Sequence, residues 1–347
     1  MKQMKKFAAL CLALAMCLYL AACGMIAGPD GPAEIIPGSS AAPAAPETPS
    51  VEEPAAHTRI AALKGPTAMG LVRLMADGGD SYAFTLAGSP DGVTPLLIQG
   101  KLDIACVPAN LAAVLYNKTG GEIVTLAVNT LGVLYIVENN GETVQSMADL
   151  AGKTIVAAGK GSTPEYGLRY LLEQNGLDPD KDVTIDWKSE HAECVAALAA
   201  GTASVALLPQ PFVTAAQNKL ENLRVALDLT AEWDALDNGS AMITGVAIAR
   251  REFVETSPAA VEAFLRDYAH SVEQVNADPA AAAELIAQYG IVENAAIAEK
   301  ALPGCNIVCI TGQELFSQLS GYLQVLYNAN PAAVGGELPR DDFFYGG

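Results

Sequence analysis

The loop at 157–167 carries the residue types that hold phosphate groups in nucleotide-binding proteins. It reads A-A-G-K-G-S-T-P-E-Y-G and lies between an apolar run and a helical pattern. A Walker loop places its lysine and hydroxyl directly after the last glycine, whereas Lys160 lies between Gly159 and Gly161. The dinucleotide pattern G-x-G-x-x-G also fails, because Pro164 occupies the position of its third glycine. The loop is therefore not a nucleotide site.

Patterns for catalysis and for metal binding are scarce. The chain has three histidines, His57, His191 and His270, and contains neither H-E-x-x-H nor G-x-S-x-G. His191 and Cys194 are spaced to share one helix face, but no second pair of metal ligands accompanies them. We expect no catalytic residue, no bound metal and no cofactor.

The N-terminus has the pattern of a bacterial export signal. Three lysines precede an apolar run of about 16 residues, Phe7 to Ala22, which is shorter than the roughly 20 that a membrane span needs. The small residues before Cys23 match a lipobox, after which the cysteine is lipidated and becomes the new N-terminus. We expect residues 1–22 to be a signal peptide and Cys23 to carry the lipid. The alternative is ordinary cleavage beside an incidental cysteine.

The composition of residues 23–57 predicts a disordered tether between the lipid and the folded part. It is rich in Pro, Ala, Gly, Ser and Glu and has few large apolar residues, so it cannot bury enough surface to order itself. We therefore expect a lipid-anchored protein on the outer face of the cytoplasmic membrane or in the periplasm. The net charge is −19, and it becomes −22 once the three lysines of the signal are removed. So acidic a surface excludes nucleic acid and anionic lipid as partners.

The remaining cysteines divide into two kinds. Cys106 and Cys194 lie in apolar runs and are expected to be buried thiols. Cys305 and Cys309 are close enough in sequence to form a short-range disulfide in an exported protein, or to stay free. Their spacing does not decide between the two.

Short apolar strands alternate with helical patterns from Thr58 onward, which predicts βαβ units and parallel sheets. In the first block the expected strands are 59–63, 82–87 and 103–107, and the helices 67–76, 92–99 and 111–117. In the second block the expected strands are 154–158, 183–187, 205–208 and 223–227, and the helices 164–174, 191–200 and 212–219. A further strand is expected at 242–249, and everything after Ser257 reads as helix.

About 290 residues follow the tether, which exceeds the usual size of one core and predicts two lobes. The fold class is α/β. We expect residues 58–132 and 245–347 to form lobe 1 and residues 133–244 to form lobe 2, with chain crossings near 129–137 and 242–249. Ligands of open α/β sheets lie beyond the carboxyl ends of the strands.

Five loops occupy such positions, and each has caps or prolines suited to a helix start. They are 64–67, 88–91, 107–110, 159–163 and 208–211. A single loop of this kind is ordinary helix capping. Convergence of all five on one cleft would instead offer backbone N–H groups and helix dipoles to a polar or anionic ligand.

The combined pattern resembles extracellular solute-binding lipoproteins of ABC importers. It rests on the lipobox, the tether, G-P-T at 65–67, L-I-Q-G-K-L-D-I-A at 97–105, L-A-G-K-T-I at 150–155, G-S-T-P-E-Y at 161–166 and L-P-R-D-D-F-F-Y at 338–345. The most similar subgroup includes nitrate-, sulfonate-, taurine- and thiamine-pyrimidine-binding proteins. The resemblance implies a two-lobed, type 2 periplasmic-binding clamshell with two hinge crossover strands. It also implies a monomer that delivers a ligand to a transmembrane permease with its ATPase.

The resemblance also implies a set of ligand-binding residues in the loops and near the crossings. They are Thr67, Ser89, Asn110, Thr130, Lys160, Ser162, Thr163, Gln210, Trp233 and Thr244. Lys64 and Lys160 could meet across the cleft and bind an anion, or could be two solvated lysines. No arginine lies in a cleft loop, which argues against a simple organic acid held by a bidentate contact. A planar heterocycle against Trp233 is a further possibility.

The function expected is that of a binding module, not an enzyme: capture of a small polar or anionic organic solute between the lobes, sulfonate-, taurine-, nitrate- or pyrimidine-like. Two alternatives remain. One is an enzyme on the same fold, similar to a pyrimidine-precursor synthase, which would need His191 in the cleft. The other is a ligand-sensing partner of a membrane receptor.

Overall fold

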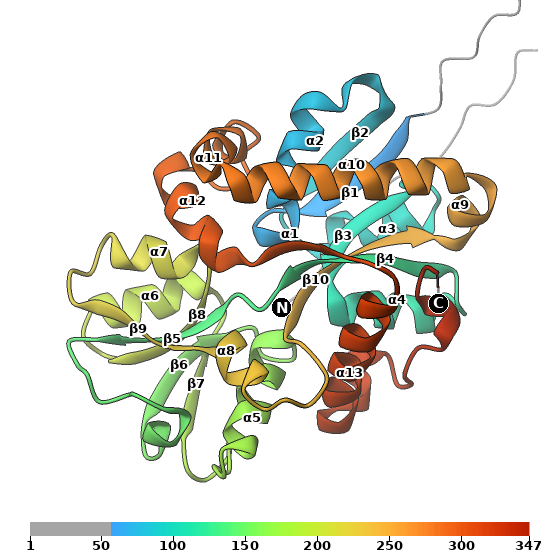
Figure 1. Ribbon diagram of the computed structural model, residues 1–347. Coiled ribbons are helices and arrows are strands. Elements are labelled where there is room, and N and C mark those ends of the chain that lie inside the picture. Colours follow the sequence, from blue (N-terminus) through green and yellow to red (C-terminus); the bar gives the residue numbers. More distant parts are fainter. Residues whose placement is uncertain (1–56, 347) are drawn as a thin grey trace, which may run out of the picture. The chain divides into compact units, whose positions relative to one another are not determined.

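Residues 57–346 are described by the structure, a computed structural model. The predictions for the signal peptide, for Cys23 and for most of the tether lie outside these residues. The described residues form one compact unit, and its strands are divided between two β-sheets. We call the part built on the six-stranded sheet the first lobe and the part built on the five-stranded sheet the second lobe (Figure 1).

The first lobe contains six strands in the order β11-β4-β10-β3-β1-β2. Their bounds are β1 Thr58–Leu63, β2 Tyr82–Ala87, β3 Ile104–Pro108, β4 Ile123–Leu131, β10 Ile243–Arg250 and β11 Ile307–Ile310. β1 pairs in parallel with β2 and β3, whereas β10 runs antiparallel to β3 and β4, and β11 antiparallel to β4. The strands contributed late in the sequence therefore reverse the direction of the sheet.

The second lobe contains five strands in the order β7-β6-β8-β5-β9. Their bounds are β5 Leu134–Asn139, β6 Thr154–Ala158, β7 Thr184–Lys188, β8 Val205–Pro209 and β9 Leu223–Asp228. β6 pairs in parallel with β7 and β8, and β5 runs antiparallel to β8 and β9. Both sheets are thus mixed, and the prediction of purely parallel sheets is wrong for the strands next to the crossings.

Helices cover both faces of each sheet. They are α1 Pro66–Met69, α2 Val72–Asp77, α3 Thr94–Ile98, α4 Ala109–Lys118, α5 Thr163–Gln174, α6 His191–Ala199, α7 Phe212–Gln217, α8 Leu229–Asp234, α9 Arg251–Thr256, α10 Pro258–Ala277, α11 Pro279–Gln288, α12 Ala295–Ala301 and α13 Gly312–Ala329. Alternate residues of β1 enter different cores, because successive strand side chains point to opposite faces. Ile60 and Ala62 pack with α1, α2 and α10 to α12, while Ala61 and Leu63 pack with α3, α4 and α13.

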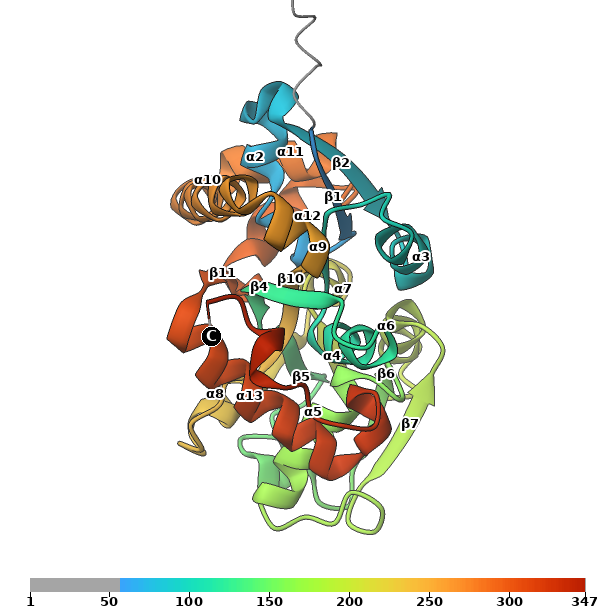
Figure 2. The same ribbon diagram turned by 90° about the vertical axis from the view of Figure 1, so that its right-hand side faces the viewer.

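The second lobe repeats this layering, with one apolar cluster continuous with the first lobe. α6 and α7 cover one face of its sheet, where Val137, Val156 and Leu208 are buried. On the other face Ile136, Ile155 and Leu207 join the cluster that also contains residues of α4, α5, α8 and α13. The two lobes therefore share one core on the side of α5 and α13 (Figure 2).

The chain crosses between the lobes twice. It leaves β4 and enters β5 through Gly132 and Val133, and it returns from β9 to β10 through α8 and residues 235–242. At the first crossing the Asn306 side chain donates from Nδ2 to the Gly132 carbonyl, with an N–O distance of 2.6 Å. The first crossing lies inside the predicted range 129–137, and the second lies just ahead of β10.

The C-terminal third of the chain also contacts both lobes. On one flank the Tyr135 hydroxyl of β5 donates to the carbonyl of Gly304, which lies in the 3-10 helix η4 Leu302–Cys305, at 2.9 Å. On the other flank, the Tyr322 hydroxyl of α13 lies 3.3 Å from Thr163 Oγ1, and Asn330 Nδ2 donates to the Tyr166 hydroxyl at 3.1 Å. Figure 2 shows α13 between α4 and α5.

Two other predictions are corrected by the structure, and one alternative that the sequence left open is decided. Residues 307–310 form β11 although everything after Ser257 reads as helix. The helix expected at 67–76 is two helices, α1 and α2, separated by Gly70 and Leu71, and Gly70 lies so close to Tyr268 that a Cβ there would be 2.7 Å from its hydroxyl. Cys305 and Cys309 are both free thiols, and burial raises the pKa of Cys305 to about 12 and that of Cys309 to about 11.

Cys106 and Cys194 are buried free thiols, as predicted from their apolar surroundings. No helix within residues 57–346 is both long and apolar enough to cross a membrane.

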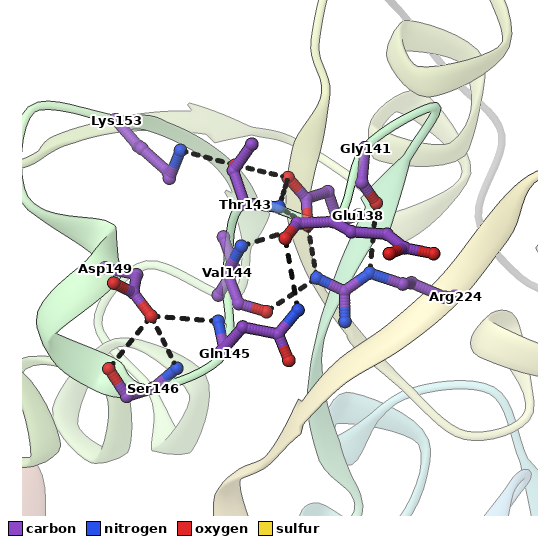
Figure 3. A network of polar contacts seen from close by, with 10 residues as sticks. Glu138, Gly141, Thr143, Val144, Gln145, Ser146, Asp149, Lys153 and Arg224 are labelled. Carbon is purple, nitrogen blue, oxygen red and sulfur yellow. Dashed lines mark hydrogen bonds and ion pairs between the residues drawn. The ribbon is translucent and has the colours of Figure 1, made fainter.

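A buried carboxylate organises the end of the second lobe that lies away from the crossings (Figure 3). Glu138 of β5 accepts hydrogen bonds from the backbone of Thr143 and Val144 and from the Thr143 hydroxyl, and Arg224 Nη2 donates to it at 2.5 Å. Arg224 also donates to the carbonyls of Gly141 and Val144. This network ties the loop after β5 to the edge strand β9.

Candidate functional site

A cleft of about 250 Å³ lies between the lobes at the crossings. Its lining comes from the loop after β1, the start of β5, the starts of α5, α6 and α7, and β10. The residues are Lys64, Gly65, Pro66, Val133, Leu134, Thr163, Pro164, His191, Pro209, Gln210, Pro211, Phe212 and Thr244. Three of the five loops predicted to converge do so here: 64–67, the end of 159–163 with the start of α5, and 208–211.

The first lobe contributes a backbone turn and a hydroxyl. Gly65, which precedes α1, has φ 111° and ψ −156°, a conformation that only glycine adopts without strain. The turn brings Lys64 and Pro66 to the edge of the cleft. Thr244, the second residue of β10, has a buried Oγ1 without a hydrogen-bond partner. A buried hydroxyl without a partner is uncommon in proteins and calls for a bound molecule or a role in function.

The second lobe contributes an imidazole that also has a buried polar atom without a hydrogen-bond partner. His191 is the first residue of α6, its ring centroid lies 5.2 Å from that of Phe212, and its Nδ1 is buried without a hydrogen-bond partner. Burial lowers the pKa of the imidazole below its ordinary value, so the ring is neutral at pH 7. Phe212 itself is 36% exposed, which is unusual for so large an aromatic side chain. The cleft therefore has two unpartnered polar atoms, one from each lobe.

The two other polar side chains on the cleft wall already have partners. Gln210 Oε1 accepts from the Thr214 hydroxyl at 2.9 Å and from the Thr214 backbone N–H at 3.3 Å. Thr163 Oγ1 lies within hydrogen-bonding distance of the buried Tyr322 hydroxyl. Both residues are more than nine-tenths buried, so they shape the wall more than they present free polar atoms.

The charge of the cleft contrasts with that of the chain. Its lining contains one lysine, Lys64, and no aspartate or glutamate among the described residues, although the net charge of the chain is −19. Seven lining residues are proline, valine, leucine or phenylalanine. Such a site is apolar with a few polar groups that fix orientation, as small-molecule sites commonly are. It favours an anion over a cation.

Several predicted site residues lie elsewhere. Ser89 is exposed on the loop before α3 and does not line the cleft. Asn110 donates to the Ala333 carbonyl at 3.4 Å, Thr67 is buried and donates to the Leu63 carbonyl at 2.9 Å, and Thr130 is buried and donates to Asn129 Oδ1 at 3.0 Å. These side chains use their polar atoms within the first lobe.

The loop with the phosphate-site composition faces a different groove. Lys160 and Gly161 line a groove between α5 and the end of α13, not the cleft that contains Lys64. The Gly161 N–H donates to Glu165 Oε2 at 2.6 Å, and the Ser162 hydroxyl donates to the Gly159 carbonyl at 2.7 Å. An anion at this loop would have to displace a carboxylate. The structure thus does not bring Lys64 and Lys160 together.

Trp233 is a core residue in this structure. Its side chain is fully buried between Tyr170 and Tyr322, with ring centroids 4.7 and 5.6 Å away, and its Nε1 donates to Ser240 Oγ at 3.0 Å. No face of the indole remains for a heterocycle.

Sequence reasoning found Thr163, Gln210 and Thr244 and placed Lys64 near the cleft, but it missed most of the apolar wall. Val133, Leu134 and Phe212 lie in no motif, and Pro66 and Pro164 lie in the motifs at 65–67 and 161–166 but were not predicted to bind the ligand. The available signal was position, since each lies at the end of a strand or the start of a helix. Among residues 57–346, no group of three His, Cys, Asp or Glu side chains is arranged to hold a metal ion.

Comparison with protein families gives a match over most of the folded part. Residues 73–298 match the model described as "ABC transporter, phosphonate, periplasmic substrate-binding protein". The chain belongs to this family of periplasmic substrate-binding proteins. The family resemblance inferred from the sequence is confirmed, and the family places the chain outside the cytoplasm as part of an ABC transport system. A comparison with curated proteins found no match.

Solved structures show the same fold as this family member. An ABC transporter structure from Parabacteroides distasonis shares 24% identity over 83% of this chain and 98% of its own, with a TM-score of 0.71. The aliphatic sulphonate binding protein SsuA from Escherichia coli shares 18% identity over 82% and 92%, with a TM-score of 0.65. The nitrate-binding protein NrtA from Synechocystis PCC 6803 shares 14% over 82% and 83%, with a TM-score of 0.55. The two-lobed periplasmic-binding fold class is thereby confirmed.

Proposed function

We propose that the protein captures a small organic anion in the cleft between its lobes and delivers it to an ABC permease. The observation that supports this most directly is that His191 and Thr244 line one cleft from opposite lobes and that each has a buried polar atom, Nδ1 and Oγ1, without a hydrogen-bond partner. A ligand oxygen between them would satisfy both and would link the lobes. The sulphonate and nitrate named for the neighbouring structures are anions, which agrees with a cleft wall without carboxylates.

The energetics favour this assignment. A buried polar atom without a partner costs about 1 to 3 kcal/mol, and a hydrogen bond to a charged group contributes about 1.5 to 3 kcal/mol. A ligand that accepts from both side chains removes the first cost and adds the second contribution. Binding would therefore also stabilise the arrangement in which the lobes are close together.

The first experiment is native mass spectrometry of the protein purified without denaturation. A bound mass that is lost under denaturing conditions would identify the chemical class of the ligand. An apo mass would lead to a thermal-shift panel of phosphonates, sulfonates, nitrate and pyrimidines. A ligand at 100 times its dissociation constant should add about 2.7 kcal/mol of stability. Stabilisation by none of the anions would contradict the proposal.

Two pairs of variants test the site once a ligand is found. His191→Ala and Thr244→Val should each weaken binding about 10-fold or more, whereas Ser89→Ala, an exposed hydroxyl outside the cleft, should not. Lys64→Ala should weaken binding more at low than at high salt, while Lys160→Ala serves as the matched lysine control. Equal effects of the two lysine variants would remove Lys64 from the site.

The proposed function also requires attachment to the membrane and movement of the two lobes relative to each other. We infer that Cys23 carries the lipid, that the protein is a monomer, and that the first lobe, which includes β10, moves as one body against the second lobe. Cys23→Ala should release the protein from membranes on fractionation. Cross-linking of the two lobes should block transport without blocking the first ligand contact.

A second candidate function has one observation in its favour. His191 lines the cleft, which is what an enzyme of the pyrimidine-precursor synthase kind on this fold would require. The binding function predicts that the ligand is recovered chemically unchanged and that the intact mass of the protein stays constant. A product, or a modified His191, would support the enzyme instead.

A further inference from the structure

The residues of the cleft wall indicate the chemistry of the part of the ligand that carries no acid group. This inference rests on the proposed function, because it concerns the same cleft. Two lining residues, His191 and Thr244, each have a buried polar atom without a partner, and this pair suits one acidic group. The rest of the wall is apolar: Pro66, Val133, Leu134, Pro164, Pro209, Pro211 and Phe212.

A ligand with an ammonium group would find no counter-charge on this wall. The lining residues contain no aspartate or glutamate, and Gln210 Oε1, an acceptor on the cleft wall, is occupied by Thr214. Lys64 adds repulsion for a second cation. Burying a cation without a counter-charge or hydrogen bonds is strongly unfavourable, so the amine would keep its water and resist closure.

Phe212 marks where the other end of the ligand would lie. It is one of three large apolar side chains that are markedly exposed within residues 57–346, and the others, Ile98 and Val225, do not line the cleft. Its ring packs beside His191, so an acid group at His191 places the adjoining carbon atoms at Phe212. Aromatic rings bury large apolar areas at little cost in conformational entropy.

We propose that the cleft selects organic acid anions whose other end is small, uncharged and apolar, and that Phe212 determines this selectivity. Aminated acids of the same size are excluded, which removes the taurine-like option among the anions expected from the sequence. The selectivity follows from the missing counter-charge as much as from the apolar contact.

The test uses two pairs of probes that differ only by a methyl group in place of an ammonium group. They are propylphosphonate against 2-aminoethylphosphonate, and propane-1-sulfonate against 2-aminoethanesulfonate. By calorimetry with the whole protein, the propyl member of whichever pair binds should have at least about 10-fold higher affinity. Phe212→Ala should reduce this preference several-fold. Val225→Ala, an exposed apolar residue of the same lobe, should leave it unchanged.

Introducing a carboxylate gives an independent check. Phe212→Glu should raise the affinity for the aminated member and lower that for the propyl member, since it supplies the missing counter-charge. Thermal unfolding of each variant verifies that it is folded. An equal affinity within the pairs, or a preference for the amine in the unmodified protein, would overturn this inference but leave the proposed anion binding intact. Failure of all four probes while another anion of the thermal-shift panel binds would overturn this inference alone, whereas failure of the whole panel would overturn both.

Discussion

At the scale of a single residue, His191 makes the stability of the folded protein depend on pH. Its pKa is lowered by burial, so the folded protein holds it neutral while the unfolded chain protonates it below about pH 6.5. Stability from this group is present above pH 6.5 and is lost as the pH falls toward the folded pKa, because the unfolded state then binds the extra proton. An anion bound beside His191 would favour the protonated ring and would therefore counteract this loss.

This pH dependence is tested by comparing the wild type with the His191→Gln variant. The melting temperature of the wild type should fall more between pH 7.5 and pH 5.5 than that of His191→Gln, measured by calorimetry. His270→Gln is the control, because His270 is exposed on α10. A His191→Gln variant with an unchanged pH profile would show that His191 is free to take up its proton in the folded state.

Glu138 gives the second prediction at this scale. Burial raises its pKa, but the hydrogen bonds from Thr143, Val144 and Arg224 outweigh burial and hold the pKa below its ordinary value. Glu138→Gln leaves Arg224 without its charged partner and should destabilise the protein by about 2 kcal/mol or more at pH 7. The deficit should shrink below about pH 4, where the wild type loses the same interaction as its carboxylate protonates.

Denaturant unfolding at pH 7 and at pH 3 measures the deficit above and below this change. Glu142→Gln, an exposed carboxylate in the same loop, should have little effect at either pH. A Glu138→Gln deficit that does not depend on pH would mean that the carboxylate charge is not what stabilises the loop.

The residues of the site were only partly predictable from the sequence. Thr163, Gln210 and Thr244 were found because they lie at the ends of recognisable strands or beside a helix start. Whether a polar side chain faces a ligand or its own lobe depends on partners far away in sequence. Asn110 bonds to Ala333, and Thr163 to Tyr322. A single sequence does not reveal such partners, and the apolar wall carries no polar signal at all.

The element that controls the first crossing is the short link between β4 and β5. A Cβ on Gly132 would lie 2.2 Å from Thr230 Oγ1 and 3.2 Å from Met242 Sδ, so α8 and the second crossing pack directly on the first. The crossings are therefore mechanically coupled at this point.

Gly132→Ala should destabilise the protein by about 1 to 3 kcal/mol, and Thr230→Ala in the same chain should recover part of the loss. Chemical unfolding measures both. Gly88→Ala, where a Cβ meets open space, is the control and should have little effect. An unaffected Gly132→Ala would mean that the link can shift without cost.

Elements with a clear period were predictable to within one or two residues: β2 and β6 have the expected bounds, and α5 begins one residue earlier. β11 was missed because four apolar residues between helical patterns give no period, and its strand character comes from pairing with β4. The antiparallel pairing of β5 and β10 was not predicted either. The direction of a strand in its sheet is set by how the chain crosses between the lobes and not by the local sequence.

At the scale of the whole molecule, hydrogen bonds bridge the lobes on both flanks of the cleft. Tyr322 and Asn330 reach α5 on one side, and Gly304 accepts from Tyr135 on the other. Opening of the lobes has to break or rearrange them.

Removing the bridge on one flank should favour the open arrangement. Tyr322→Phe combined with Asn330→Ala should increase the radius of gyration of the ligand-free protein in solution scattering and weaken ligand binding about 5-fold or more. Asn328→Ala is the matched control, because Asn328 bonds to Gln324 within α13. A double variant that scatters and binds like the wild type would show that this flank does not oppose opening.

The strand order described above also sets the order in which the lobes can be assembled. The second sheet is built from one continuous stretch, β5 to β9, whereas β4 lies between β10 and β11, which follow it by more than a hundred residues. As the chain emerges from export, the second lobe can complete its sheet while β4 still has two unpaired edges. Substitutions in β11, or in β10 away from Thr244, should therefore reduce the yield of exported protein more than they change the affinity of the molecules that mature.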